Sequence, residues 1–297
     1  MKEFLVTDLT TKNNIKNFLA SKNISSTAYK KLKMANCLTI NGQQLQHNIT
    51  LQAGDKVGLV LPAETTTIIP EQGALEIIYE DDALLLVNKP APLLTHPTVQ
   101  CATGTLANLV AGYYVATHQQ CGIHPISRLD RNTSGLVLFA KHALYHHLMT
   151  QNRIKKEYLG LVHGELFPAT GIITAPLARK PGSIIEREVN FDQGQNAKTS
   201  YETLATNQKI SLVRFVLGTG RTHQIRVHCA YLHCPLWGDN LYGLSGPQTR
   251  HMLHAFKLTM VLPFTDDTLA FTIPLPNDMV SLMENEKLCY NNIMKKI

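Results

Sequence analysis

The sequence predicts an α+β fold in which most strands pair antiparallel and helices interrupt them at irregular intervals. Short segments of alternating or fully apolar residues follow one another closely, which favours antiparallel neighbours over the regular strand–helix repeat of a doubly wound fold. Apolar residues make up 44% of the 297 residues, enough for a real core. Charged residues make up 17%, so the composition excludes a disordered chain.

The first 62 residues predict a small α/β module. Thr10 or Thr11 can cap a first helix and Ser25 or Ser26 a second, because a hydroxyl oxygen accepts the free N–H groups at a helix start. The outer face of the second helix carries three lysines: Lys30, Lys31 and Lys33. Asn-Gly at 41–42, between two short apolar runs, predicts a hairpin, and residues 57–61 predict a closing strand.

A linker and a larger domain follow this module. Residues 63–73 are rich in Thr, Pro and Glu without a helical period, so they predict the linker to a domain over 74–297. Apolar patterning predicts strands in that domain over 75–79, 83–88, 135–140, 157–162, 198–204, 210–217 and 269–273. Helical character predicts helices over 106–117, 142–152, 222–233 and 276–290.

The sequence also predicts a cytoplasmic protein without a membrane span. Its longest apolar runs, such as 83–87, are far shorter than the ~20 residues that cross a bilayer. The first 14 residues lack the apolar core of a secretory signal. The net charge of +6 weakly favours an acidic partner. Nothing in the sequence demands an oligomer, so we expect a monomer.

An aspartate stands between two arginines just before the apolar run 135–140. Arg128, Asp130 and Arg131 belong to Ser-Arg-Leu-Asp-Arg-Asn-Thr-Ser-Gly over 127–135. One interpretation is a solvated ion pair, which contributes ~0–1 kcal/mol. The other is a carboxylate kept ionised by neighbouring cations at the mouth of a strand, where it could act on a substrate. These residues alone do not decide between the two.

A glycine-rich turn opens the predicted helix over 222–233. Gly218 and Gly220 let a ligand or a backbone approach closely, with Arg221 beside them and Arg226 further along. This is either a capped helix with basic decoration or a guanidinium aimed at a carboxylate or phosphate. Tyr158, behind two lysines, likewise either packs in its strand or stacks on a nucleic-acid base.

The cysteines and histidines offer one candidate metal cluster. None of the six cysteines forms Cys-x-x-Cys. Two pairs stand five residues apart: His228 with Cys229, and His233 with Cys234. No second ligand group stands at zinc-finger spacing and buried cysteine is common, so we predict no bound metal.

Three sequence blocks are together far more specific than any one alone. Arg-Leu-Asp-x-x-Thr-Ser-Gly stands at 128–135, Lys-x-Tyr at 156–158 and Gly-Arg-Thr-His-Gln-Ile-Arg-Val-His at 220–228. With these blocks the sequence resembles the large family of RNA pseudouridine synthases that modifies uridines in ribosomal and transfer RNA. Supporting blocks stand in the same order: Asn88-Lys89-Pro90 with His96-Pro97, Pro235-Leu236-x-Gly238-Asp239 with Tyr242-Gly243, and Leu253-His254-Ala255.

The resemblance covers nearly the whole chain, with two departures. Residues 10–62 are similar to the S4 RNA-binding domain that often precedes this catalytic domain, which favours RNA contact by its three lysines. The family most often has His where this chain has Ser127, and Gly where it has Pro92. Because Arg128 and Asp130 are intact, these departures bear on the target more than on the activity.

The resemblance implies an isomerisation that needs no cofactor and no metal. The bond from ribose C1′ to uracil N1 breaks, the base turns, and C1′ rejoins the base at C5. Asp130 would be essential, either attacking C1′ or removing the 2′ proton. Arg221 would pair with Asp130, and Tyr158 would stack on a uracil flipped out of the RNA.

The resemblance also implies residues that hold the RNA, ribosomal or transfer. Arg128 would fill the gap that the flipped base leaves. Ile225 would lie against the base, or simply pack within its helix. Further RNA contacts are implied for a basic group: Arg131, Lys156, His223 and Arg226, with Lys30, Lys31 and Lys33 of the N-terminal module.

Two rival functions stay open on the sequence. A catalytically silent RNA-binding or assembly factor could keep the fold, although the joint presence of Asp130, Arg221 and Tyr158 argues against it. A metal-dependent hydrolase could use another set: Asp130, His223, His228 and His233. The hydrolase predicts bound metal and loss of activity with a chelator, whereas the synthase predicts neither.

Overall fold

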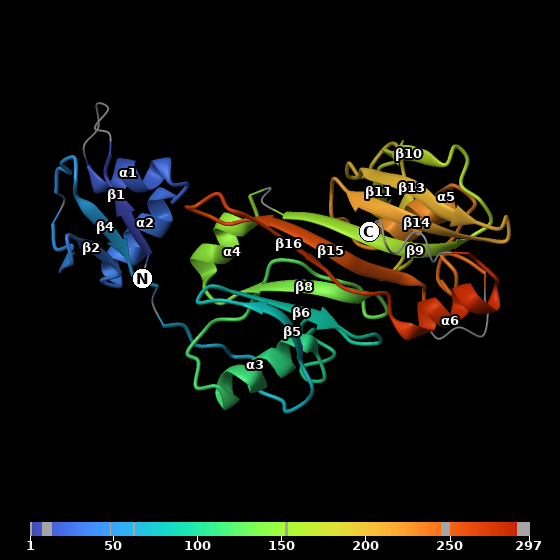
Figure 1. The fold of residues 1–297 in the computed structure, drawn as a ribbon, viewed down its shortest axis with the longest axis horizontal. Coiled ribbons are helices and arrows are strands. Elements are labelled where there is room, and N and C mark those ends of the chain that lie inside the picture. Colours follow the sequence, from blue (N-terminus) through green and yellow to red (C-terminus); the bar gives the residue numbers. More distant parts are fainter. Residues whose placement is uncertain are drawn as a thin grey trace.

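The structure is built from β-sheets with helices packed against them, which confirms the predicted α+β class (Figure 1). The structure is a computed structural model that describes residues 2–7, 14–47, 49–61, 63–151, 154–244 and 250–289. Its larger sheet holds, in spatial order, β10 (Thr170–Ile173), β13 (Thr199–Thr206), β14 (Ile210–Leu217), β9 (Ile154–His163), β15 (Leu253–Val261), β8 (Ser134–Ala140), β6 (Leu84–Lys89) and β5 (Glu76–Glu80). Two more strands join it: β16 (Thr268–Thr272) pairs with β15, and β7 (His124–Pro125) with β8.

The N-terminal module has its own sheet and two helices. The sheet holds, in order, β1 (Lys2–Leu5), β4 (Lys56–Leu59), β2 (Leu38–Ile40) and β3 (Gln43–Gln44). The helices are α1 (Ile15–Ser21) and α2 (Ser26–Met34). Ser25 caps α2 as predicted, since its Oγ accepts the N–H of Ala28 at 3.1 Å. Asn14 caps α1, in place of Thr10 or Thr11, which lie outside the described residues.

A left-handed turn and one aromatic contact shape this module. Asn41 and Gly42, with φ of 53° and 80°, turn β2 into β3, as the Asn-Gly pair predicts. Lys30 and Lys31 are exposed on α2, and Lys33 is partly buried. The ring of Phe4 in β1 lies 4.9 Å from that of Phe264, so the module packs against the turn between β15 and β16.

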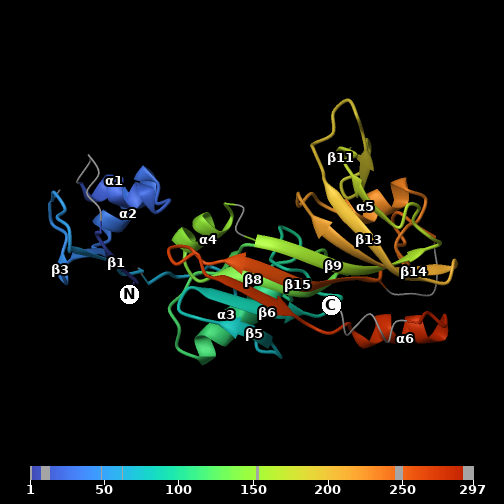
Figure 2. The same cartoon turned by 45° about the horizontal axis from the view of Figure 1, so that its top comes forward.

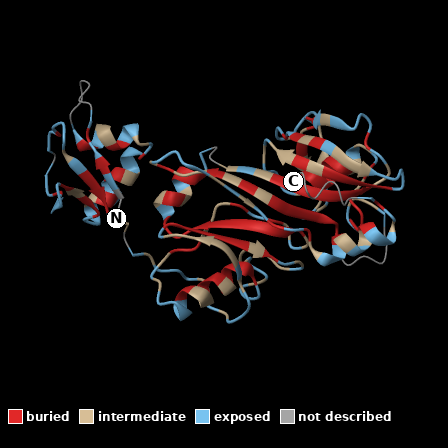
Figure 3. Cartoon of the chain, in the orientation of Figure 1, coloured by how far each residue is buried: buried red, intermediate tan, exposed pale blue. Residues whose placement is uncertain are grey.

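Helices cover both faces of the larger sheet because its central strands are apolar on both sides (Figure 3). They are α3 (Leu106–Ala116), α4 (Ala143–Met149), α5 (Gln224–Tyr231) and α6 (Asn277–Asn285). Alternate residues of β6 serve opposite faces: Leu85 and Val87 share a cluster with α3, and Leu84 and Leu86 share one with α4.

The helix predicted over 222–233 is shorter in the structure and begins at Gln224. In β9, Tyr158 faces the cluster of α5, and Leu159 faces that of α6. Among the helices in the described part of the chain, none is long and apolar enough to cross a membrane.

A parallel pairing explains the glycine of the Thr-Ser-Gly block. β15, which was not predicted, runs parallel to β8, with Ser134 opposite His254 and Gly135 opposite Ala255. Gly135 has φ of 117°, and a Cβ on it would collide with the backbone of Ala255. Only glycine accepts both the left-handed φ and the close approach.

The chain segment that connects β10 to β13 forms a short hairpin, which extends away from the larger sheet (Figure 2). Its strands β11 (Leu177–Arg179) and β12 (Arg187–Val189) pair antiparallel with Ala178 opposite Glu188. Neither strand was predicted. We call this segment the β11–β12 hairpin.

Candidate active site

The predicted site residues converge on one cavity of about 390 Å³. The loop before β8, the start of β9 and the turn into α5 form its walls. Eight of the predicted residues line it: Arg128, Asp130, Lys156, Tyr158, Arg221, His223, Ile225 and Arg226. Arg131 is exposed nearby in the sequence but does not line the cavity, and the three lysines of α2 belong to the N-terminal module.

A buried lysine ties down the loop that carries Asp130. The Nζ of Lys89, fully buried, donates to the carbonyl oxygens of Pro90, Leu93 and Arg131 at 3.1, 2.7 and 3.2 Å. Burial, only partly offset by the charge of Asp130, lowers the pKa of Lys89 to about 7. Because Arg131 adjoins Asp130, this cluster of hydrogen bonds fixes the backbone beside the carboxylate.

Two histidines of the β15 region hold the other end of this loop. The ring of His251 lies 2.7 Å from the hydroxyl of Thr133, and that of His254 lies 2.8 Å from the hydroxyl of Ser134. Burial lowers the pKa of His251 to about 3 and that of His254 to about 4, so both rings are neutral at neutral pH. The Thr-Ser-Gly block is therefore anchored to the strand beside it by side chains as well as by backbone.

The carboxylate of Asp130 is paired with Arg226, which corrects the predicted pairing with Arg221. The Nη1 of Arg226 lies 3.4 Å from Oδ2 of Asp130. Arg221 is exposed, and its Nε donates to the carbonyl of Asn196 at 3.0 Å. The helix α5 starts after Arg221, so its first turn directs Arg226 toward Asp130 instead.

Arg226 is a largely buried cation between two carboxylates, and its predicted contact with RNA stays a prediction, confined to the cavity that it lines. Its Nε and Nη2 donate to the two carboxylate oxygens of Asp239, both at 2.8 Å. Asp239 is 1% exposed and Arg226 7%, so the little surface that Arg226 has belongs to the cavity. The bond to Arg226 lowers the pKa of Asp239 despite burial, and a forked guanidinium is suited to serve two carboxylates at once.

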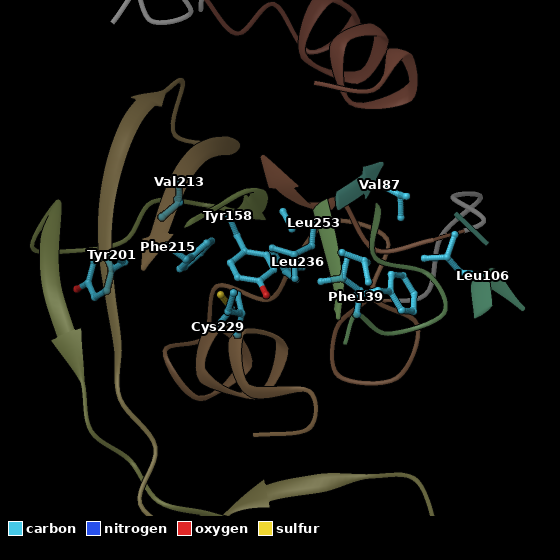
Figure 4. Close-up of a cluster of buried hydrophobic side chains, with 14 of the residues drawn as sticks. Val87, Leu106, Phe139, Tyr158, Tyr201, Val213, Phe215, Cys229, Leu236 and Leu253 are labelled. Atoms are coloured by element: carbon cyan, nitrogen blue, oxygen red, sulfur yellow. The ribbon is translucent and has the colours of Figure 1, made fainter. Parts of the chain in front are cut away.

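Tyr158 of β9 lines the cavity, and its ring lies within a cluster of buried side chains (Figure 4). It is 4% exposed and shares a core cluster with Phe215, Leu253 and Ile225. Burial, reinforced by the charge of Asp130, raises the pKa of the Tyr158 hydroxyl far above its ordinary value, so it stays protonated. Ile225 both packs in this cluster and lines the cavity, so the two interpretations of it are compatible.

The remaining cavity residues differ in exposure. Arg128 is exposed at the rim, and Lys156 is partly buried with a pKa lowered by burial. His223, predicted to contact RNA, has only 11% of its side chain exposed, and its Nε2 lies 3.8 Å from Oδ2 of Asp130. Its place is therefore against the carboxylate rather than on the outer surface.

The candidate metal cluster is not assembled. Both ring nitrogens of His228 are occupied, Nδ1 by the hydroxyl of Thr199 and Nε2 by the carbonyl of Ala175, each at 2.9 Å. His233 is exposed beyond the end of α5. Within the described ranges, no three His, Cys, Asp or Glu side chains are grouped as metal ligands would be.

Ser127 and Pro92, the two departures from the family motifs, lie outside the cavity lining. The Oγ of Ser127, 2% exposed, accepts the N–H of Leu138 at 3.0 Å. Pro92 is exposed in the loop next to the Lys89 cluster. Neither residue lines the cavity.

Comparison with known proteins shows the family of this chain. Residues 83–231 match the family model for RNA pseudouridylate synthases. The chain belongs to this family. The chain is 40% identical to the uncharacterized RNA pseudouridine synthase YhcT of Bacillus subtilis (strain 168), over 82% of this chain and 83% of that protein. It is 32% identical to ribosomal large subunit pseudouridine synthase D of Buchnera aphidicola subsp. Schizaphis graminum, over 87% and 89%.

A solved structure shares the fold of this pseudouridine synthase. Human RNA pseudouridylate synthase domain containing 4 aligns with a TM-score of 0.58 at 23% identity, over 72% of this chain and 94% of that chain. The protein is thus an RNA pseudouridine synthase, which isomerises uridine within RNA.

Several residues that support this synthase's site were not predicted as site residues. Lys89, Asp239 and Tyr242 appeared only within supporting sequence blocks, and His251 in none. Lys and Asp are rarely buried without a partner. The position of Lys89 and Asp239 next to apolar residues in the sequence was therefore the signal that could have marked them as paired, buried groups.

Proposed function

We propose that the enzyme converts specific uridines of ribosomal RNA to pseudouridine, with Asp130 as the catalytic residue. The supporting observation is the carboxylate of Asp130 in a cavity beside a buried tyrosine ring. Relatives named ribosomal large subunit pseudouridine synthase D, similar over most of both chains, favour ribosomal over transfer RNA. We also propose that the enzyme acts as a monomer in the cytoplasm, where its RNA is assembled.

Four residues of the cavity have a part in the proposed reaction. Asp130 attacks C1′ or removes the 2′ proton while the C1′–N1 bond breaks. Arg226 pairs with that carboxylate and orients it. Tyr158 stacks on the uracil, and after C1′ joins C5 the C5 proton leaves while N1 gains one, so no atom or electron is lost. Ile225 forms the wall against the base.

RNA binding extends from the cavity onto the protein surface. Arg128, exposed at the rim, fills the gap left by the flipped uridine, whose unstacking costs a few kcal/mol. Arg131 and Lys156 supply further charge near the RNA backbone. We propose that the N-terminal module is S4-like and binds RNA through α2, with Lys30, Lys31 and Lys33.

A basic groove next to the cavity offers a path for the RNA strand. It has a volume of about 410 Å³ and includes Arg179 and Arg187 of the β11–β12 hairpin. Arg221 lines both the groove and the cavity. A strand whose uridine enters the cavity therefore passes three guanidinium groups, which suit phosphate oxygens.

Mapping pseudouridines across total cellular RNA tests this function. A strain without the gene is compared with strains rescued by the wild type or by Asp130→Asn. We expect sites in ribosomal RNA to be lost on deletion, restored by the wild type and not by the variant. Loss of pseudouridines in transfer RNA alone would show that the substrate is transfer RNA rather than ribosomal RNA. Unchanged pseudouridine with an assembly defect rescued by both versions would establish an RNA-binding factor instead.

The groove predicts a binding effect separate from chemistry. Arg179→Ala and Arg221→Ala should each raise KM about three- to tenfold with little change in kcat, and lower the slope of log affinity against log salt by about 1, since each removes one phosphate contact. Lys209→Ala is the matched control, because Lys209 is exposed but lines neither cavity nor groove. A fall in kcat at unchanged KM would place Arg221 in the chemistry instead.

A further inference from the structure

His223 occupies an unusual backbone position between two polar side chains. Its φ is 57°, in the left-handed region that few residues other than glycine adopt. Its Nδ1 lies 2.7 Å from the hydroxyl of Tyr242, and its Nε2 lies 3.8 Å from Oδ2 of Asp130. Strained backbone of this kind persists where the surroundings determine it, and it is often found at functional sites.

The hydrogen bonds around Tyr242 determine where the imidazole proton lies. The backbone N–H of Arg187 donates to the Tyr242 hydroxyl at 2.8 Å, so this oxygen already acts as an acceptor. Within the described residues, the acceptor for its single hydrogen is Nδ1 of His223. Nδ1 is then unprotonated, and the ring carries its hydrogen on Nε2, the atom that faces Asp130.

The charges around His223 favour its neutral form. Burial lowers its pKa, and so do the guanidinium groups of Arg226 in α5 and Arg187 in β12; the carboxylates of Asp130 and Asp239 act in the opposite direction and do not cancel these effects. Arg226 also lies over the ring of Tyr242, 4.9 Å from its centroid, which holds the tyrosine in place.

Arg226 and His223 both approach the same carboxylate oxygen of Asp130. Nη1 of Arg226 and Nε2 of His223 point to Oδ2. The described residues give Oδ1 no hydrogen bond or ion pair. The two oxygens of the carboxylate, which lines the cavity, are thereby made different: Oδ2 has two partners and Oδ1 has none among the described residues.

We propose that His223, set in its Nε2–H form by Tyr242, is a positioning residue that with Arg226 binds Oδ2 and leaves Oδ1 to act on the ribose. This inference rests on the proposed catalytic role of Asp130. The 3.8 Å separation shortens to a hydrogen bond when the uridine enters, because catalytic hydrogen bonds tighten in the substrate complex. Since Arg187 belongs to the β11–β12 hairpin, RNA bound along the groove also steadies the N–H that fixes Tyr242.

The tautomer is directly measurable in the unmodified full-length enzyme. Nitrogen NMR of ¹⁵N-histidine-labelled protein distinguishes a neutral ring protonated on Nε2 from one protonated on Nδ1, and the His223→Gln spectrum assigns the signal. We expect the Nε2–H form at neutral pH. A neutral Nδ1–H form, or a charged ring, would overturn the proposal whether or not any variant folds well.

Two variants should move the acid side of the pH–rate profile in opposite directions. Tyr242→Phe removes the bond that only an unprotonated Nδ1 accepts, so His223 takes up a proton at higher pH. A charged ring still donates Nε2–H, but it adds a second positive charge to that of Arg226 beside Oδ2 and so makes Oδ1 a weaker base and nucleophile. Activity is therefore lost at higher pH. His223→Gln removes the titrating ring, so activity persists to lower pH. Each variant should lower kcat about tenfold to hundredfold with KM unchanged, as expected for a lost hydrogen bond to a charged group.

The assay uses total RNA from the deletion strain, labelled with tritium at uracil C5, because the reaction releases that hydrogen. His233→Gln is the matched control, since His233 is exposed and has φ of 59°. Tyr231→Phe is the control for the lost hydroxyl, because Tyr231 is exposed on the far end of α5. Both controls should retain the wild-type rate and profile.

The outcomes separate this inference from the proposed function. If Asp130→Asn is inactive while Tyr242→Phe and His223→Gln lower kcat without moving the acid limb, their role is only structural and this inference fails alone. If both variants move the limb in the same direction, it fails as well. If Asp130→Asn keeps full activity, the proposed function fails and this inference with it.

Discussion

Asp130→Asn should abolish isomerisation while leaving the fold and RNA binding intact. An amide neither attacks C1′ nor removes the 2′ proton, so the rate should fall by about 10⁴- to 10⁶-fold, the range seen when one charged or nucleophilic catalytic side chain is removed. Asparagine has the shape of aspartate and can still accept the N–H groups near Oδ2. Tritium release from C5-labelled RNA measures the rate, and filter binding measures the affinity.

A second aspartate provides the control for this substitution. Asp82 is exposed in the turn between β5 and β6, so Asp82→Asn should leave the rate unchanged. An Asp130→Asn enzyme that binds RNA and retains more than about a tenth of the wild-type rate would contradict a catalytic role, since that loss is within the range of a single hydrogen bond.

Arg226→Met should have the largest effect on stability as well as a large effect on activity. It leaves the carboxylate of Asp239, 1% exposed, without its forked partner. Breaking a buried ion pair in this way costs about 3–5 kcal/mol in free energy of unfolding. It also removes the cation beside Asp130, and we expect activity to fall about 10³-fold or more.

A double variant separates the two roles of Arg226. Arg226→Met with Asp239→Asn removes both buried charges, and the asparagine oxygen still accepts the N–H groups of Leu241 and Tyr242. Denaturant unfolding should then show most of the lost stability recovered. The rate should stay as low as in the single variant. Recovery of activity together with stability would mean that Arg226 serves the fold alone.

Local sequence patterns predicted those parts of the fold and the site that are determined by residues adjacent in the sequence. The Asp130 motif, the strand of Tyr158 and the hairpin turn at Asn41 and Gly42 were all predictable, because a few adjacent residues determine them. The choice between Arg221 and Arg226 was not. It depends on where α5 begins, and a shift of a few residues at a helix start changes which side chain faces the carboxylate.

Contacts between distant residues were out of reach of the sequence. Thr133 meets His251 and Ser134 meets His254 across 118 and 120 residues, and a single sequence holds no record of such pairs. β15 was missed although its second half alternates apolar and polar residues over 256–260, and what a single sequence does not hold is its place between β8 and β9. The strands of the β11–β12 hairpin are three residues each, too short for any period to show.

The place of β15 has a consequence for how the enzyme is made. Strands β5, β6 and β8 lie on one side of it and β9, β14, β13 and β10 on the other, and each group is complete in the chain before β15 is synthesised. The two half-sheets can therefore form early from nearby pairs while the chain is being made, and β15 joins them later. Asp130 arrives with the first half and Tyr158 with the second. Without β15, a nascent chain would hold both residues but lack the strand that pairs with β8 and with β9, so we expect the active site to be completed only after this strand has been made.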